Sequence, residues 1–167
     1  KVKSVKDLKK KVKEKKIELN DKILLGLKYH GVYKTNIPRE EINKTCKLIK
    51  KVINKLNKKN NLDNNNKYIF EICGSYRREK PYSNDIDILI TKYSDNTDIN
   101  HLEIIVKKFK KNIKSNNSKP FLIDDMTDKN IETKYMGFSK YKDNPIRRID
   151  IRYVSYSSFY YALLYFT

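Results

Sequence analysis

Residues 68–91 read YIFEICGSYRREKPYSNDIDILIT and contain the most informative pattern in the chain. The first part, YIFEIC, is rich in residues that favour β-strands and stops at Gly74-Ser75, which indicates a turn. The last part, DIDILIT, alternates carboxylates with isoleucines. Because side chains two apart in a strand point to the same face, Asp85 and Asp87 share one face of a predicted strand, and the isoleucines between them point into a core.

Two aspartates on one strand face repel each other, and a divalent cation reverses this unfavourable interaction. Mg²⁺ in particular binds a few carboxylates together with substrate phosphates. The alternative is an exposed edge strand with solvated aspartates, and the D-x-D pattern alone leaves it open. The turn favours the metal site, because backbone N–H groups and the hydroxyl of Gly74-Ser75 can hold a phosphate. Arg77 and Arg78 follow and can pair with its oxygens.

A third carboxylate lies in RRIDIR, residues 147–152, which is again strand-like. Arg148, Asp150 and Arg152 share one face of this predicted strand. A neighbouring strand could place Asp150 beside the other two aspartates, and three carboxylates can hold two metal ions. The alternative is a surface ladder of arginines and aspartates, which contributes little to stability. A phosphate-binding turn next to a metal-binding strand is the combination that nucleotidyl transfer requires.

Helical and strand patterns divide the chain into two parts. Helices are predicted to begin after Ser4, after Asn20 and near Pro38, and residues 57–66, NKKNNLDNNN, are predicted to form a loop. Beyond it, strands are predicted at 121–124, 133–138 and 146–154, and helices at 101–113 and 157–167. The expected fold class is α+β, with a short all-helical module at 1–60. A module with a mixed, mainly antiparallel sheet and flanking helices follows at 67–167.

The composition limits the class of protein. The chain has 38 Lys+Arg and 20 Asp+Glu, for a formal net charge of +18. This excess reflects either a skewed genome rich in lysine codons or a polyanionic partner such as nucleic acid. No apolar run approaches the roughly 20 residues of a membrane span, so no membrane partner is expected. Cys46 and Cys73 lack spaced partners, which excludes a disulfide scaffold and a structural zinc site and favours a reducing, intracellular compartment. His30 and His101 are interpreted as structural.

Three blocks of sequence resemble family X DNA polymerases. Residues 74–91, GSYRREKPYSNDIDILIT, resemble the palm motif of that family. Residues 147–167, RRIDIRYVSYSSFYYALLYFT, resemble its third-aspartate strand and the helix that follows. Residues 26–42, GLKYHGVYKTNIPREEI, resemble the stretch that leads into the palm. The first block alone would indicate only the nucleotidyltransferase superfamily, whereas the three blocks in order are specific for family X.

The resemblance implies roles for individual residues. Asp85, Asp87 and Asp150 match the catalytic aspartates that bind two Mg²⁺ ions, for which Mn²⁺ can substitute. Contacts to the triphosphate are implied for Arg39, Gly74, Ser75, Arg78 and Asn84. Arg148 and Arg152 match supporting arginines that order the aspartates and the primer end. Tyr165 and Phe166 match the pair near the sugar of the incoming nucleotide, and this pair is typical of templated enzymes. Asn84 stands where the family usually has glycine, and it can supply the same N–H but not every glycine conformation.

The implied activity is that of a DNA-directed DNA polymerase that adds dNMP from a dNTP to a primer 3′-hydroxyl, in gap-filling DNA repair. The implied partners are gapped primer–template DNA and a dNTP, and the chain is expected to be monomeric. It is expected to be a piece of a longer protein, without the helix-hairpin-helix or the C-terminal subdomain that closes over the base pair. The nucleus and a viral or cytoplasmic replication site are both open as locations. Two other functions stay open: a nucleotidyltransferase with an RNA or small-molecule acceptor, and a non-catalytic DNA-binding module.

Overall fold

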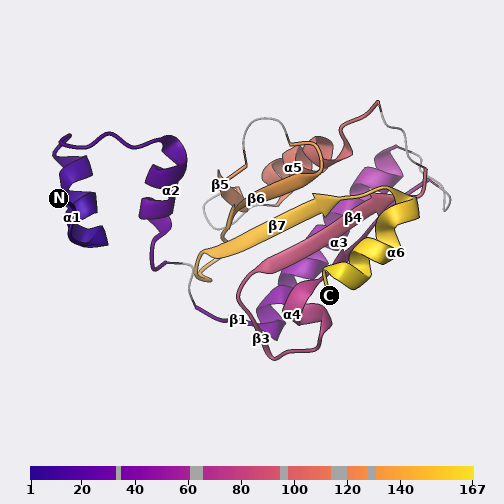
Figure 1. Cartoon of the computed structure of the whole chain (residues 1–167). Coiled ribbons are helices and arrows are strands. Elements are labelled where there is room, and N and C mark those ends of the chain that lie inside the picture. Colours follow the sequence, from indigo (N-terminus) through magenta and orange to yellow (C-terminus); the bar gives the residue numbers. More distant parts are fainter. Residues whose placement is uncertain (33–34, 61–65, 95–97, 114–119, 128–130) are drawn as a thin grey trace. The chain divides into compact units, whose positions relative to one another are not determined.

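The structure is a computed structural model that describes residues 1–32, 35–60, 66–94, 98–113, 120–127 and 131–167. It divides into two compact units, Lys1–Tyr33 and Lys34–Thr167 (Figure 1). The first unit contains α1 (Val5–Lys13) and α2 (Asp21–Tyr29). Both helices begin where the sequence predicts, because the side chains of Ser4 and Asn20 accept hydrogen bonds from backbone N–H groups of the first turn.

The second unit is built on a five-stranded sheet with the strand order β2-β4-β7-β6-β5. The strands are β2 (Tyr68–Ile72), β4 (Ile86–Lys92), β5 (Leu122–Asp125), β6 (Lys134–Ser139) and β7 (Arg147–Tyr153). The β4–β7 pair is parallel and the other pairs of this sheet are antiparallel. Two short strands, β1 (Ile37–Pro38) and β3 (Tyr82–Ser83), form a separate antiparallel pair that the sequence did not predict. The predicted α+β class with a mixed, mainly antiparallel sheet is therefore confirmed.

Helices cover both faces of the sheet. On one face, α3 (Arg39–Lys59) and α5 (His101–Asn112) pack over the isoleucines of β4 and β7. On the other face, α6 (Tyr156–Tyr165) packs its Phe159 against Leu89 and Cys73. Figure 1 shows α6 and the helix pair on opposite sides of the strands. Because side chains alternate along β4, the face that carries Asp87 is the face of α6 and not that of α3 and α5.

The position of α3 differs from the expected division of the chain. We expected α3 in an all-helical module at 1–60, but it belongs to the second unit, where it packs against β2 and α5. The reason is its apolar stripe, in which Ile42, Ile49, Ile53 and Leu56 are buried in the core under the sheet. α3 also continues to Lys59, so the predicted loop begins later than residue 57, and residues 61–65 of it lie outside the described residues. In the described ranges no helix has the length and apolar character needed to cross a membrane.

Candidate active site

The pairing of β4 with β7 brings the predicted aspartates together. In this parallel pair, Asp87 is the direct partner of Asp150, and Asp85 immediately precedes β4. The flanking isoleucines of both strands are buried toward α3 and α5, which leaves the carboxylates on the opposite face. β4 and β7 thus form one site, although Asp85 and Arg148, which are hydrogen-bonded there, are 63 residues apart in sequence.

Arg148 lies between two of the aspartates. Its Nη2 donates to Asp85 Oδ2 at 2.7 Å and is 3.4 Å from Asp150 Oδ2. The other Asp150 oxygen, Oδ1, is buried and has no hydrogen-bond partner among the residues that the structure describes. The guanidinium therefore compensates part of the negative charge and leaves one buried carboxylate oxygen unsatisfied.

The electrostatics of the site favour a positive ligand. Burial, together with the neighbouring carboxylates of Asp85 and Asp150, raises the pKa of Asp87 to about 6, against the opposing effect of two arginines. Burial also raises the pKa of Asp150, although the nearby Arg148 lowers it. A raised pKa means that the ionised form is unfavourable where it stands, so any cation placed beside these groups would be stabilised.

The turn after β2 lies directly beside Asp87. α4 (Gly74–Arg77) begins here, and Gly74 has a φ of +62°, which is accessible to glycine at little cost. A Cβ at this position would overlap the Asp87 carboxylate, so any other residue would force that side chain to shift. The Gly74 N–H donates to the Phe166 carbonyl at 2.7 Å. In this structure the Gly74 N–H, which we expected to contact a phosphate, is therefore already bonded.

The other residues predicted to bind triphosphate surround this turn. Ser75 Oγ donates to Ser83 Oγ at 2.8 Å, and Arg78 and Asn84 are exposed. Arg39, the first residue of α3, donates from Nη1 to the Tyr76 carbonyl at 2.6 Å, and its guanidinium lies 4.1 Å from the centre of the Tyr76 ring. The structure thus places Arg39 against the turn although it is distant in sequence.

The end of α6 closes the site from another side. The Arg152 guanidinium lies 4.5 Å from the centre of the Phe166 ring, whereas Tyr165 is 82% exposed. Arg152 and Phe166 together with Cys73, Asp87, Ile88, Leu89 and Asp150 line a small cavity of about 20 Å³. Of the two aromatic residues predicted near the nucleotide sugar, the structure brings Phe166 next to the aspartates and leaves Tyr165 in solvent.

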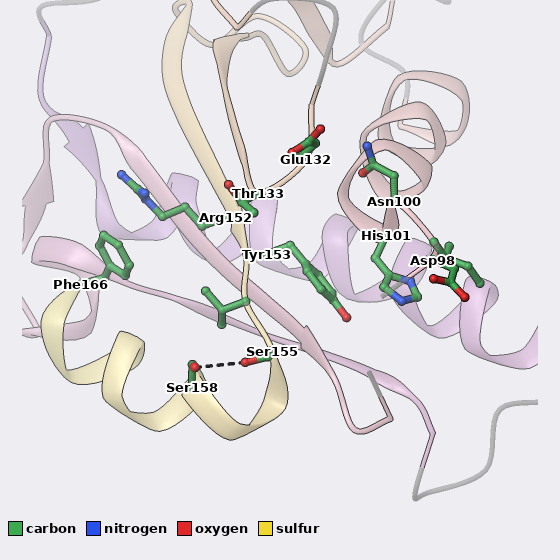
Figure 2. A pocket seen from close by; sticks show the side chains of 12 residues that line it. Asp98, Asn100, His101, Glu132, Thr133, Arg152, Tyr153, Ser155, Ser158 and Phe166 are labelled. Carbon is green, nitrogen blue, oxygen red and sulfur yellow. Dashed lines mark hydrogen bonds between the residues drawn. The ribbon is translucent and has the colours of Figure 1, made fainter. Parts of the chain in front are cut away.

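A larger cavity of about 780 Å³ adjoins this one and shares Arg152 and Phe166 with it. Figure 2 shows His101 and Tyr153 in this cavity, apart from Arg152 and Phe166. The His101 ring is buried, with Nδ1 2.7 Å from the Tyr68 hydroxyl and its centroid 5.0 Å from that of Tyr153. These contacts agree with the interpretation of His101 as a structural residue.

Sequence reasoning missed three residues that organise the site: Tyr76, Ser83 and Glu41. Glu41 binds the buried Arg147 through two hydrogen bonds of 2.7 and 2.8 Å, next to Arg148 in β7. Tyr76 holds Arg39 and Ser83 holds Ser75, as described above. For Tyr76 the position inside GSYRR was a usable signal, whereas the partners of Ser83 and Glu41 depend on tertiary packing.

The donor atoms suit Mg²⁺ chemically but are not arranged as a finished metal site. Within the described ranges, no three carboxylate, histidine or cysteine groups form a cluster that could hold a metal ion. The Arg148 guanidinium occupies the space between Asp85 and Asp150, which explains this in part. Even so, the all-oxygen donor set is the kind that a hard divalent cation prefers. Such a cation would also satisfy the buried Asp150 oxygen and stabilise the ionised form of Asp87, whose pKa is raised.

Comparison with known proteins relates the chain to DNA polymerases. Residues 36–156 match the family described as DNA polymerase beta palm, a range that includes the three aspartates and the turn. The chain is also 30% identical over 148 residues to DNA polymerase lambda of Rattus norvegicus. This alignment covers 86% of the chain and 23% of the relative, so the chain spans less than a quarter of that protein's length. Tyr165 and Phe166 lie beyond the range of the family match.

Proposed function

Because the chain belongs to the family X DNA polymerases, with a palm of the DNA polymerase beta type, we propose that it forms the catalytic palm of a DNA-directed DNA polymerase. The proposed reaction joins a primer 3′-oxygen to the α-phosphorus of a dNTP. The bond from that phosphorus to the bridging oxygen breaks, pyrophosphate leaves, and the 3′-hydroxyl loses its proton. The observation that supports this most directly is the register that places Asp87 opposite Asp150, with Asp85 beside them.

The three aspartates are the residues that would hold the metal. Two Mg²⁺ ions, or Mn²⁺ in their place, would lower the pKa of the 3′-hydroxyl and neutralise charge on the triphosphate when bound. Arg148 restrains Asp85 and Asp150 through its hydrogen bonds. The partial burial of Asp87 and Asp150 limits the access of water, which strengthens electrostatic interactions at this place.

The turn and its neighbours would bind the triphosphate. The Ser75 hydroxyl is held by its hydrogen bond to Ser83, and Arg78, at the end of α4, is exposed. Arg39 would act from α3, where Tyr76 fixes its guanidinium. Gly74 and Asn84 complete the proposed phosphate-binding set. For the Gly74 N–H to bind phosphate, the end of α6 must first release it, since Phe166 accepts that hydrogen bond here.

The remaining assignments concern the primer and the nucleotide sugar. Arg148 and Arg152 are the proposed supporting arginines, and Tyr165 and Phe166 the proposed contacts to the sugar. The proposed partners are gapped primer–template DNA and a dNTP, in gap-filling DNA repair. Family membership and the similarity to DNA polymerase lambda support these proposals.

The function is tested by primer extension with Asp150→Asn in the full-length protein, and not in residues 1–167 alone. The variant should lose about a thousandfold or more in rate, because a carboxylate essential for metal-assisted phosphoryl transfer contributes several kcal/mol to the barrier reduction. Its affinity for DNA at low salt should stay the same or rise slightly, because repulsion from phosphate falls. Asp143→Asn, at an exposed loop position, is the matched control and should extend the primer at the normal rate.

Three outcomes would contradict the proposal. Extension by Asp150→Asn at a rate close to normal would remove the aspartate from the reaction. A preference for ribonucleotides, or for an acceptor other than a DNA primer, would favour a different nucleotidyltransferase. If the full-length protein binds DNA but incorporates no nucleotide with Mg²⁺ or Mn²⁺, the palm is a non-catalytic module.

A further inference from the structure

A groove lined by lysines lies between α3 and α5, on the side of the sheet opposite the aspartates. Its cavity is about 360 Å³ and has Val52 and Leu56 at its base. Lysine side chains from both helices line it: Lys55 and Lys59 from α3, and Lys108 and Lys111 from α5. Figure 1 shows the two helices on the same side of the sheet, with α6 on the other. We call this feature the α3–α5 groove.

The arrangement follows from helical spacing. Residues three or four apart are neighbours on one helix face, so each helix presents its two lysines side by side. Among the residues that the structure describes, no carboxylate lines the groove. The acidic residues near α5 are used elsewhere, since Glu103 pairs with Lys107 and Asp125 with Lys110. Four lysine side chains thus line the groove without a neighbouring carboxylate in the described part of the chain, which makes it a positive surface that attracts anions.

We infer that the α3–α5 groove binds the phosphate backbone of duplex DNA, as a second contact separate from any DNA at the aspartates. Lysine side chains on a surface attract phosphate through charge alone, independently of base sequence. The described residues that line the groove include no aromatic side chain, so they offer no surface on which a base could stack. The contact is therefore to the backbone and is not sequence-specific.

The base of the groove argues against an acidic protein segment as its ligand. Amphipathic peptides bind grooves mainly by inserting apolar side chains. Val52 and Leu56 are each only 5% exposed, so they provide almost no apolar surface for such an anchor. A phosphate backbone needs none, because its affinity comes from the release of counterions.

The groove is also independent of the proposed reaction. The sheet separates it from Asp87 and Asp150, whose side chains lie on the α6 face. DNA held in the groove cannot therefore be the segment that reacts at the aspartates. This separation allows the inference to be tested without metal or nucleotide, so that a failure of the polymerase proposal would not affect the result.

Lysine acetylation footprinting of the unmodified chain is the first test, with a blunt DNA duplex in EDTA and detection by mass spectrometry. The four groove lysines should react at least about fivefold more slowly when the duplex is bound, because phosphate contacts bury their amines. Lys44, Lys47, Lys50 and Lys51 are the internal control, since they are exposed on the same helix but do not line the groove. Their reactivity should change less than about twofold.

A quadruple Lys→Gln variant of the groove lysines provides the second test. Glutamine has nearly the helix propensity of lysine, so α3 and α5 should be retained, which circular dichroism can check. The plot of the logarithm of the DNA-binding constant against the logarithm of the salt concentration should become less steep. Its slope should decrease in magnitude by about 3 to 4, at roughly 0.9 for each lost phosphate contact. The same change at the four control lysines should lower the slope by less than about 1.

Three results would overturn the inference. The first is equal protection, or an equal change of slope, in the groove and control sets, which would attribute binding to overall charge. The second is protection of the groove lysines by polyglutamate but not by the duplex, which would indicate an acidic protein partner. The third is protection by free triphosphate at the same phosphate concentration as effectively as by the duplex, which would indicate a small-anion site.

Discussion

The protein environment of Asp87 disfavours the ionised form of its carboxylate. Its pKa is raised from 3.8 to about 6, because it is buried near Asp85 and Asp150, and Arg148 and Arg152 offset only part of this. The folded state therefore binds the proton more tightly than the unfolded state. The associated stability is present below about pH 4 and is lost as the pH rises through about 6. At neutral pH the ionised Asp87 destabilises the metal-free protein.

The first residue-scale prediction uses Asp87→Asn. In EDTA at pH 8 the variant should have a free energy of unfolding higher by about 1–2 kcal/mol, because it removes a carboxylate that is unfavourable there. At pH 4 this gain should vanish, because Asp87 is then protonated in the native protein. Urea unfolding at both pH values measures the effect, with Asp143→Asn as the control. A gain of equal size at pH 4, or a loss at pH 8, would show that repulsion and burial are not what governs this position.

At the residue scale the sequence predicted which side chains matter but not how they are bonded. The D-x-D and RRIDIR patterns placed the three aspartates on shared strand faces, and the structure puts Asp87 opposite Asp150. The position of Arg148 between two carboxylates, and the bond from Gly74 to Phe166, were not predictable. They depend on the distance between segments, which strand periodicity does not contain.

At the element scale, a buried ion pair connects β7 to α3. Arg147 donates from Nε and Nη2 to both oxygens of Glu41, and from Nη1 to the Thr35 carbonyl at 2.9 Å. The side chains of Arg147 and Glu41 are only 5% and 12% exposed. Removing one partner of such a pair leaves an uncompensated buried charge, whereas apolar replacement of both costs much less.

Glu41→Ala should therefore lower the free energy of unfolding by about 3 kcal/mol or more. The double replacement Glu41→Leu with Arg147→Met should lose less than the single change, because no buried charge is then left unpaired. Glu103→Ala is the matched control, since its pair with Lys107 is exposed and should contribute less than about 1 kcal/mol. Urea unfolding of the three variants decides this. A double variant that is less stable than Glu41→Ala would show that the pair itself, and not the unpaired arginine, sets the loss.

The sequence largely predicted the helices and strands, but it did not predict which of them pack against one another. The apolar stripe of α3 predicted a helix with one buried face, and that face is buried. The stripe cannot reveal what covers it, so α3 was expected in a separate helical module and is found under the sheet. The short strands β1 and β3 have two residues each, too few for any alternation to be visible in the sequence.

At the scale of the whole molecule, buried residues and charge are divided unequally between the two units. Among the described residues, Tyr29 is the only buried hydrophobic side chain of Lys1–Tyr33, and α1 buries none. The same segment contains 11 lysines and four acidic residues in the printed sequence. The hydrophobic core that supports the fold is therefore in Lys34–Thr167, whereas Lys1–Tyr33 contributes mostly positive charge.

Shortening the chain to residues 34–167 should consequently leave its folding almost unchanged and weaken its binding to DNA. The melting temperature should stay within about 5 °C and unfolding should stay cooperative, because the buried side chains of the core are retained. The salt dependence of DNA binding should become less steep, by roughly 0.9 in slope for each lysine–phosphate contact that the segment makes, and the contribution of the α3–α5 groove should remain.

Residues 1–33 alone should be unfolded by circular dichroism, because isolated helices shorter than about 12 residues are marginal in water. Calorimetry and salt titrations of the full and shortened chains measure both effects. A shortened chain that melts without cooperativity would place part of the essential core in residues 1–33. An unchanged salt slope would mean that the lysines of that segment do not contact DNA, and that their abundance reflects the composition of the genome.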